Sequence, residues 1–156
     1  MQLDGKSLSI ENVLSVAREG ENVELAPNAK ESMNRSHKWL QEILSSGEPV
    51  YGINTGFGIF ADQSISPENS IKLSRNLILS HAVATGESLS EEIVRAAMLI
   101  RANTLASGYS GVRTEVVEIL LAMLNKGVSP VVPAQGSLGS SGRFGVALSP
   151  STRIYD

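Results

Sequence analysis

The sequence predicts a mainly α-helical fold with a small β ribbon near its start. Residues that favour helix N-termini and glycines that end helices bracket successive apolar stretches with helical spacing. Segments with strand-like alternation are few and short. With 156 residues and 42% hydrophobic content, the chain can form one ordinary domain or a part of one.

Five helices are expected between these signals. Ser9 is an N-cap candidate for the first helix, Pro27 suits the first position of the second, and Ser66 begins the third. Ser88 with Glu91 three positions later matches a capping box for the fourth helix. The expected ranges are 10–19, 27–46, 67–85, 89–106 and 113–126, and the glycines expected to end helices are Gly20, Gly47, Gly86 and Gly127.

Each expected helix has an apolar side. In the third helix this side includes a histidine, His81, in line with Leu73 and Leu77. The corresponding sides are Val13, Leu14 and Ala17 in the first helix, Ile93, Ala96, Ala97, Ile100 and Thr104 in the fourth, and Val116, Ile119, Leu120, Met123 and Leu124 in the fifth. Residues 7–10 and 23–25 are expected to pair as the ribbon.

The composition excludes several kinds of site and partner. The chain has no cysteine, which excludes disulfides, thiolate zinc sites and cysteine nucleophiles and favours a reducing compartment, with the cytoplasm as the working expectation. The net charge of -3 and the low aromatic content of 4% do not suit nucleic-acid binding. No export signal is recognised at the start, and no stretch approaches the roughly 18 apolar residues of a membrane span. We therefore expect no metal, nucleic acid or membrane partner.

Two segments interrupt the helical pattern and are rich in Gly, Ser, Asn and Thr. They are YGINTGFG at 51–58 and VVPAQGSLGSSG at 131–142. On composition alone, both are typical of turns or linkers. The glycine spacing of the second segment fits neither a dinucleotide-binding turn nor a P-loop.

These two segments and the blocks between them resemble the N-terminal part of the histidine and aromatic amino-acid ammonia-lyase family, in particular its histidine branch. The resemblance runs from about residue 3 to residue 142 and includes NLILSHAVATGE at 76–87 and RAAMLIRANTLASGYSGVR at 95–113. It implies the N-terminal portion of the mainly α ammonia-lyase fold, which is part of the fumarase/aspartase-like helical superfamily. It also implies non-oxidative elimination of ammonia from an amino acid, with urocanate as the product from histidine.

The resemblance implies a prosthetic group that the chain makes from itself. In the family, a tripeptide, usually Ala-Ser-Gly, cyclises and loses two waters to form 4-methylidene-imidazol-5-one, an electrophile that no ordinary side chain supplies. Ser140-Ser141-Gly142 matches that tripeptide here. Ring closure needs a backbone contortion that glycine permits most readily. The literal Ala-Ser-Gly at 106–108 is interpreted as a helix stop.

Four further residues are matched to the family's substrate site. Tyr51 corresponds to the base that removes a proton from the β-carbon, a role that needs a stabilised phenolate because a free phenol loses its proton only near about pH 10. His81 corresponds to a residue that lines the pocket for the substrate side chain, while Asn54 and Gly58 are weaker substrate-binding candidates. From the sequence alone, Tyr51 could also be an ordinary aromatic and His81 a core histidine. His37 is expected on a solvated helix face.

The resemblance ends after Gly142, which divides the chain into an ammonia-lyase N-terminal region at 1–142 and a divergent tail at 143–156. Arg143 stands where the family has an aspartate associated with ring formation, and a reading-frame slip is one hypothesis for the change. Family members are about three times this length and assemble as tetramers, so the resemblance implies a homo-oligomer. Two alternatives stay open: a tyrosine or phenylalanine ammonia-lyase or aminomutase, and a catalytically silent helical fragment that only self-associates.

Overall fold

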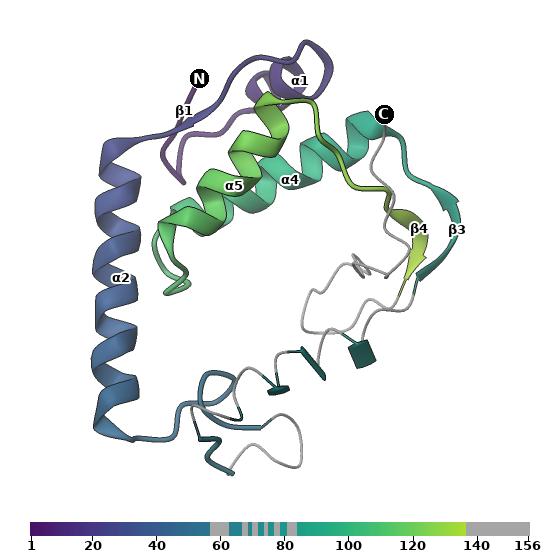
Figure 1. Ribbon diagram of the computed structural model, residues 1–156. Coiled ribbons are helices and arrows are strands. Elements are labelled where there is room, and N and C mark those ends of the chain that lie inside the picture. The colour runs from purple at the N-terminus through teal and green to yellow at the C-terminus, as the bar shows by residue number, and fades with distance from the viewer. Residues whose placement is uncertain are drawn as a thin grey trace. The chain divides into compact units, whose positions relative to one another are not determined.

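The structure is a computed structural model, and it describes residues 1–56, 63–66, 69, 72–73, 75–76, 79–80 and 84–136 (Figure 1). The described residues are mainly helical, as predicted. The elements are β1 (Gln2–Leu3), α1 (Ile10–Arg18), β2 (Glu24–Leu25), α2 (Pro27–Ser46), β3 (Ala84–Ser88), α4 (Glu91–Ala106), α5 (Thr114–Asn125) and β4 (Pro133–Gly136). They divide between two compact units, one formed by Met1–Leu40 and Glu87–Val132 and the other by described residues of 41–86 and 133–136.

The predicted helix ends are confirmed where they rest on caps. Ser9 is the N-cap of α1, where its Oγ accepts from the Asn12 N–H at 3.2 Å and the Asn12 side chain accepts from the Ser9 N–H at 3.1 Å. This reciprocal pair satisfies two N–H groups that a helix start leaves open. α2 begins at Pro27, and α5 spans nearly the expected range. The fourth helix ends at Ala106, so the Ala-Ser-Gly at 106–108 is a helix stop as interpreted.

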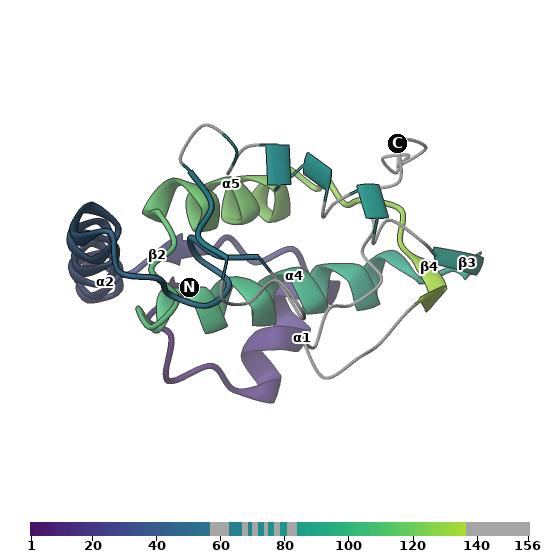
Figure 2. The ribbon, with the colours of Figure 1, turned by 90° about the horizontal axis from the view of Figure 1, so that it is seen from below.

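In the first unit, α1, α4, α5, the first part of α2 and the short ribbon enclose one apolar core. α4 contacts both α1 and α5, and α5 contacts β2. Figures 1 and 2 show α4 and α5 lying side by side. Burial of these side chains supplies the main stabilising free energy of such a unit. The most completely buried large side chains are Leu3, Met33, Leu99, Leu124, Val16, Val23 and Val117.

The predicted partner of the ribbon is wrong. β1 pairs in parallel with β2, with Gln2 opposite Glu24 and Leu3 opposite Leu25, whereas residues 7–10 form no strand. The Asp4 carboxylate accepts from the N–H groups of two following residues, at 2.8 and 2.9 Å, and so turns the chain away from an extended path. Residue 10 is then taken into α1.

The boundary between the third and fourth helices is also wrong. The described residues Asn69, Lys72, Leu73, Arg75, Asn76, Leu79 and Ser80 are helical, which agrees with a third helix. However, residues 84–88 form the strand β3. Its partner is β4, and this strand occupies residues 133–136, where a loop was expected. α4 therefore starts later, at Glu91, and its N-cap Ser90 makes no side-chain cap bond. Pairing between distant segments has overridden the local capping signal at 88–91.

The apolar side predicted for α4 faces solvent. Ile93 is 52% exposed and Ile100 is 50% exposed, while the opposite side of the helix is buried. Both sides of this helix are apolar, so periodicity alone does not decide which of them joins the core. The core side consists of Val94, Arg95, Met98, Leu99, Ala102, Leu105 and Ala106. In α5 the predicted Leu124 is buried, but Ile119 is 61% exposed.

Arg95 is a charged residue inside this core. Its side chain donates to the carbonyls of Val16 at 2.8 Å, Ala17 at 3.2 Å and Leu124 at 3.0 Å. These carbonyls lie in the last turns of α1 and α5, where a helix carries partial negative charge. The Leu124 carbonyl also accepts from the Gly127 N–H at 3.2 Å. One guanidinium therefore joins the C-terminal ends of two helices to a third.

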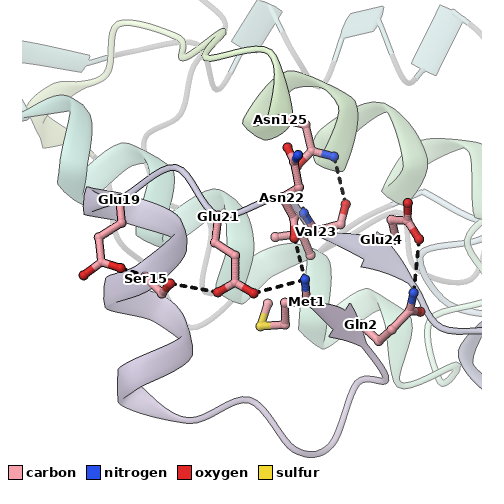
Figure 3. A network of polar contacts seen from close by, with 9 residues as sticks. All are labelled: Met1, Gln2, Ser15, Glu19, Glu21, Asn22, Val23, Glu24 and Asn125. Atoms are coloured by element: carbon pink, nitrogen blue, oxygen red, sulfur yellow. Dashed lines mark hydrogen bonds and ion pairs between the residues drawn. The ribbon is translucent and has the colours of Figure 1, made fainter.

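A polar network holds the N-terminal segment against this core (Figure 3). The Met1 ammonium donates to the Asn22 carbonyl at 2.6 Å and lies 3.1 Å from Glu21 Oε1. Ser15 Oγ donates to Glu21 Oε2 at 2.8 Å. Across the same region, Asn125 brackets Val23, accepting from its N–H and donating to its C=O, both at 2.9 Å. The amide of Asn125 thereby acts as a substitute strand partner.

This network predicts a loss of stability in acid. The hydroxyl of Ser15 and the chain ammonium lower the pKa of Glu21 below its ordinary value of 4.5. Because the folded pKa is the lower one, the stabilisation is present above the unfolded pKa and is lost as pH falls through the folded value, from about pH 5 downward. We expect Glu21→Gln to flatten this part of the pH dependence, measured by urea unfolding at stepped pH. The control is Glu31→Gln, on the exposed surface of α2, and an equal flattening there would contradict the assignment.

α2 also holds the connection between α4 and α5, and this corrects the expectation for His37. His37 is half-buried, with its Nδ1 2.8 Å from the carbonyl oxygen of Gly111, so it is not a solvated face residue. Ser36 accepts from the N–H of the same glycine at 3.0 Å. Gly111 has a φ of +62°, and a Cβ there would lie 2.8 Å from the Leu40 side chain. The positive φ favours glycine here, and a larger residue would also force the Leu40 side chain to shift.

Candidate active site

The first candidate loop begins as a tight turn after α2. The Ile53 and Asn54 N–H groups both donate to the Val50 carbonyl, at 3.0 and 3.3 Å. The Asn54 side chain closes the same turn: its Oδ1 accepts from the Val50 N–H at 2.7 Å and its Nδ2 donates to the Glu48 carbonyl at 2.8 Å. Residues 50–54 are thus fixed by backbone and side chain together.

Gly52 and Thr55 complete the turn. Gly52 has a φ of +75°, which a residue with a side chain rarely adopts. Its N–H donates to Thr55 Oγ1 at 3.2 Å, and that hydroxyl donates to the Gly56 carbonyl at 3.1 Å. Thr55 is only 1% exposed and pairs with Ser64 in an isolated antiparallel bridge. Thr55 is not among the residues predicted from the octapeptide, although a hydroxyl three residues after a glycine is a recognisable turn signal.

The phenol-bearing residue of this turn is turned outward. Tyr51 is 63% exposed, whereas Thr55 of the same turn is buried. The N–H groups of Gly52 and Gly56 are both used inside the loop: Gly52 donates to Thr55 Oγ1, and Gly56 donates to the Gln63 carbonyl at 3.1 Å. The turn therefore exposes the tyrosine and uses these two N–H groups internally.

The structure brings together two of the predicted site residues, Tyr51 and Asn54, which lie three positions apart in one turn. The others, namely Gly58, His81, Ser140, Ser141 and Gly142, lie outside the described residues. β4 ends at Gly136, four positions before Ser140.

β4 is packed closely against β3. Gly86 of β3 has a φ of +89°, and a Cβ there would lie 3.3 Å from the Cγ and Cδ of Gln135. The glycine therefore lets the Gln135 side chain lie against the backbone of the neighbouring strand. This contact fixes the strand that leads into the second candidate segment.

No other site emerges from the part of the chain that the structure describes. A groove of about 580 Å³ lies beside Arg18, Glu92 and Arg95. Both of its arginines are already engaged, because Arg18 Nε lies 2.6 Å from Glu92 Oε1 and Arg95 is bonded to carbonyls. Within the described ranges there is no cluster of His, Cys, Asp or Glu that could hold a metal ion. Among the described helices, none has the length and apolar character needed to cross a membrane.

Comparison with known proteins identifies the family. The sequence model for aromatic amino acid lyases matches residues 8–147, which is most of the chain. The chain belongs to the aromatic amino acid lyase family, and the resemblance found in the sequence is confirmed.

The relatives include histidine ammonia-lyases. The enzyme of Caldanaerobacter subterraneus subsp. tengcongensis is 51% identical over 140 residues, covering 90% of this chain and 28% of the relative. The chain thus spans about 28% of the length of the curated relatives that it matches.

Solved structures agree with the helical fold. Histidine ammonia-lyase from Trypanosoma cruzi is 35% identical with a TM-score of 0.80, covering 88% of this chain and 26% of that one. Tyrosine aminomutase from Streptomyces globisporus is 33% identical with a TM-score of 0.83, again covering 88% and 26%. The predicted fold class, the N-terminal part of an ammonia-lyase fold, is therefore confirmed.

Proposed function

We propose that the chain is the N-terminal part of a histidine ammonia-lyase, which eliminates ammonia from L-histidine to give urocanate. The observation that carries this proposal is a rigid turn that presents Tyr51 at the surface, in a chain about half identical to histidine ammonia-lyases. A cytoplasmic location and assembly into a homotetramer belong to the same proposal. The division into a region at 1–142 and a tail at 143–156 is kept as part of it.

The prosthetic group of the family, 4-methylidene-imidazol-5-one, would arise from Ser140, Ser141 and Gly142. What supports the fit is the tightly packed strand pair, in which Gly86 and Gln135 fix β4 shortly before the tripeptide. When formed, the group supplies an electrophile that captures the amine or ring of the substrate. The chemistry needs no metal.

Tyr51 is proposed as the base. Its phenolate oxygen accepts a proton from the substrate β-carbon, the electron pair of that C–H bond forms the carbon–carbon double bond, and the α-amino group leaves as ammonia. The exposure of the tyrosine ring, 63%, leaves it accessible to a substrate or to a second chain. The turn contributes by holding the ring in one place, since an oriented base reacts faster than a mobile one.

A second candidate is an aminomutase or lyase that acts on tyrosine or phenylalanine. It is favoured by the high structural similarity to tyrosine aminomutase, with a TM-score of 0.83. The two candidates differ in the amino acid consumed and in whether ammonia returns to the β-carbon. His81 is the residue whose role in the substrate pocket would distinguish histidine from other side chains.

A third candidate is a silent fragment that self-associates. The exposed isoleucines Ile93 and Ile100 on α4 favour it, because contiguous exposed apolar surface promotes association. An intact mass without loss of water, together with concentration-dependent sedimentation, would support this candidate.

The test of the proposed function combines mass and turnover. We expect the intact mass to show a deficit of two waters localised to residues 140–142, and we expect histidine to be converted to a conjugated acid detected by ultraviolet absorbance. Ser141→Ala is expected to abolish both, because alanine has no hydroxyl to lose as water. A full mass together with no turnover of histidine, tyrosine or phenylalanine would overturn the proposal for this chain.

A further inference from the structure

We infer that Asn54 is a positioning residue for Tyr51 and does not bind the substrate. The inference rests on the proposed function for the role of Tyr51 as a base. It assigns to Asn54 a different role from the weak substrate-binding role expected from the sequence.

The amide of Asn54 is directed at the chain immediately before the tyrosine. Its Oδ1 accepts from the Val50 N–H at 2.7 Å, and its Nδ2 donates to the Glu48 carbonyl at 2.8 Å. Both polar atoms of the side chain therefore have short bonds to the backbone of residues one and three positions before Tyr51. An asparagine side chain that is hydrogen-bonded to the backbone in this way restrains the turn, as backbone hydrogen bonds do.

The backbone of Asn54 extends this restraint to a second segment. Its carbonyl accepts from the Ile65 N–H at 2.8 Å, and the adjacent Gly56 N–H donates to the Gln63 carbonyl at 3.1 Å. Asn54 thus lies where the tyrosine turn is bonded to residues 63–65. Loss of its side chain would leave Tyr51 on a turn attached by fewer bonds.

Asn54 and Tyr51 differ in burial, in agreement with different roles. Asn54 is half-buried, while Tyr51 is 63% exposed. Asn54 thus supports the turn, and Tyr51 is exposed on it. Misplacement of a reacting group by about 1 Å can cost about a hundredfold in rate. A positioning role therefore predicts a loss in kcat, whereas a substrate contact predicts a rise in KM.

The chain offers a matched control in Asn125. Its amide makes the same pair of bonds, accepting from an N–H and donating to a C=O, both at 2.9 Å, but on Val23 in the other unit. Asn54→Ala and Asn125→Ala thus remove equivalent interactions, and only the first acts on the turn of Tyr51.

The experiment measures steady-state kinetics with histidine and the ¹⁹F NMR spectrum of the 3-fluorotyrosine-labelled chain, with Tyr51 assigned through Tyr51→Phe. For Asn54→Ala we expect kcat to fall about tenfold or more, KM to stay within about twofold, the mass deficit to be retained, and the Tyr51 resonance to broaden or split. Asn125→Ala should leave kcat and the Tyr51 resonance unchanged. The resonance of Tyr109 reports whether the rest of the chain is folded.

A raised KM with unchanged kcat, or a Tyr51 resonance identical to that of the wild type, would overturn the inference. If Asn54→Ala also shifts the Tyr109 resonance, Asn54→Asp replaces it, because aspartate retains the acceptor for the Val50 N–H; the same two outcomes then decide. Absence of turnover in the wild type would count against the proposed function alone, since the NMR measurement decides separately whether Asn54 holds Tyr51.

Discussion

Replacing Tyr51 with phenylalanine is expected to lower kcat for histidine by about 10² to 10⁴, the usual contribution of a general base. The substitution keeps the ring and removes only the hydroxyl, so the turn bonded through Asn54 and Thr55 should stay intact. The mass deficit at residues 140–142 should also be unchanged, because formation of the prosthetic group does not involve this hydroxyl in our proposal. Initial rates of conjugated-acid formation, measured beside the intact mass, give the comparison.

The matched control is Tyr109→Phe. Tyr109 is another exposed tyrosine, 88% exposed, on the connection between α4 and α5. The Tyr109→Phe variant should retain full activity. Equal losses in the two variants, or near-normal turnover in Tyr51→Phe, would exclude Tyr51 as the base.

Replacing Arg95 with methionine is expected to lower the free energy of unfolding by at least about 2 kcal/mol, since it leaves the carbonyls of Val16 and Ala17 without a donor and each such buried acceptor costs about 1 to 3 kcal/mol. Arg95 is 7% exposed and donates to three carbonyls, on residues that are themselves 0 to 8% exposed. Methionine keeps much of the apolar stem but supplies no donor. A loss of this size is a large part of the roughly 5 to 15 kcal/mol that stabilises a typical domain. Urea unfolding monitored by circular dichroism measures it.

Arg101→Met provides the comparison on the same helix. Arg101 lies on the exposed side of α4, so its replacement should change the unfolding free energy by no more than about 0.5 kcal/mol. A similar loss in both variants would mean that helix propensity or net charge, and not the carbonyl bonds, explains the result for Arg95.

The helices could be predicted because their signals are local. The capping box of Ser9 with Asn12 and the proline at position 27 act within one turn, and the structure confirms both helix starts. The strand expected at 23–25 is observed as β2. The strand pairings could not be predicted, because the partners lie far away in the sequence. β1 pairs with β2, which follows about 22 residues later in the sequence. β3 pairs with β4, and α4 and α5 lie between these two strands in the sequence.

The core side of α4 illustrates a second limit. Ile93 and Ile100 form an apolar stripe as convincing as the one that is buried. The buried side includes Arg95, which a hydrophobicity pattern counts against burial, yet three carbonyls at helix ends offset the cost of its charge. The hydrophobic periodicity of a helix does not reveal such partners, because they belong to other helices.

For the candidate site, the octapeptide predicts Tyr51 as the base, and this role stays a prediction. The use of the Asn54 side chain became visible only in the structure. An asparagine in a turn can bond either to a ligand or to its own backbone, and the composition of the loop fits both. The distances to Val50 and Glu48 decide in favour of the backbone. The roles of Ser140, Ser141 and Gly142 stay predictions.

The contacts of α2 with Gly111 limit where the chain can gain or lose residues. Two neighbouring residues, Ser36 and His37, bind the N–H and C=O of a single glycine in the connection between α4 and α5. An added or deleted residue between Ala106 and Gly111 would move that glycine out of register with both side chains at once. Changes in length are therefore tolerated better elsewhere on the surface than in this connection.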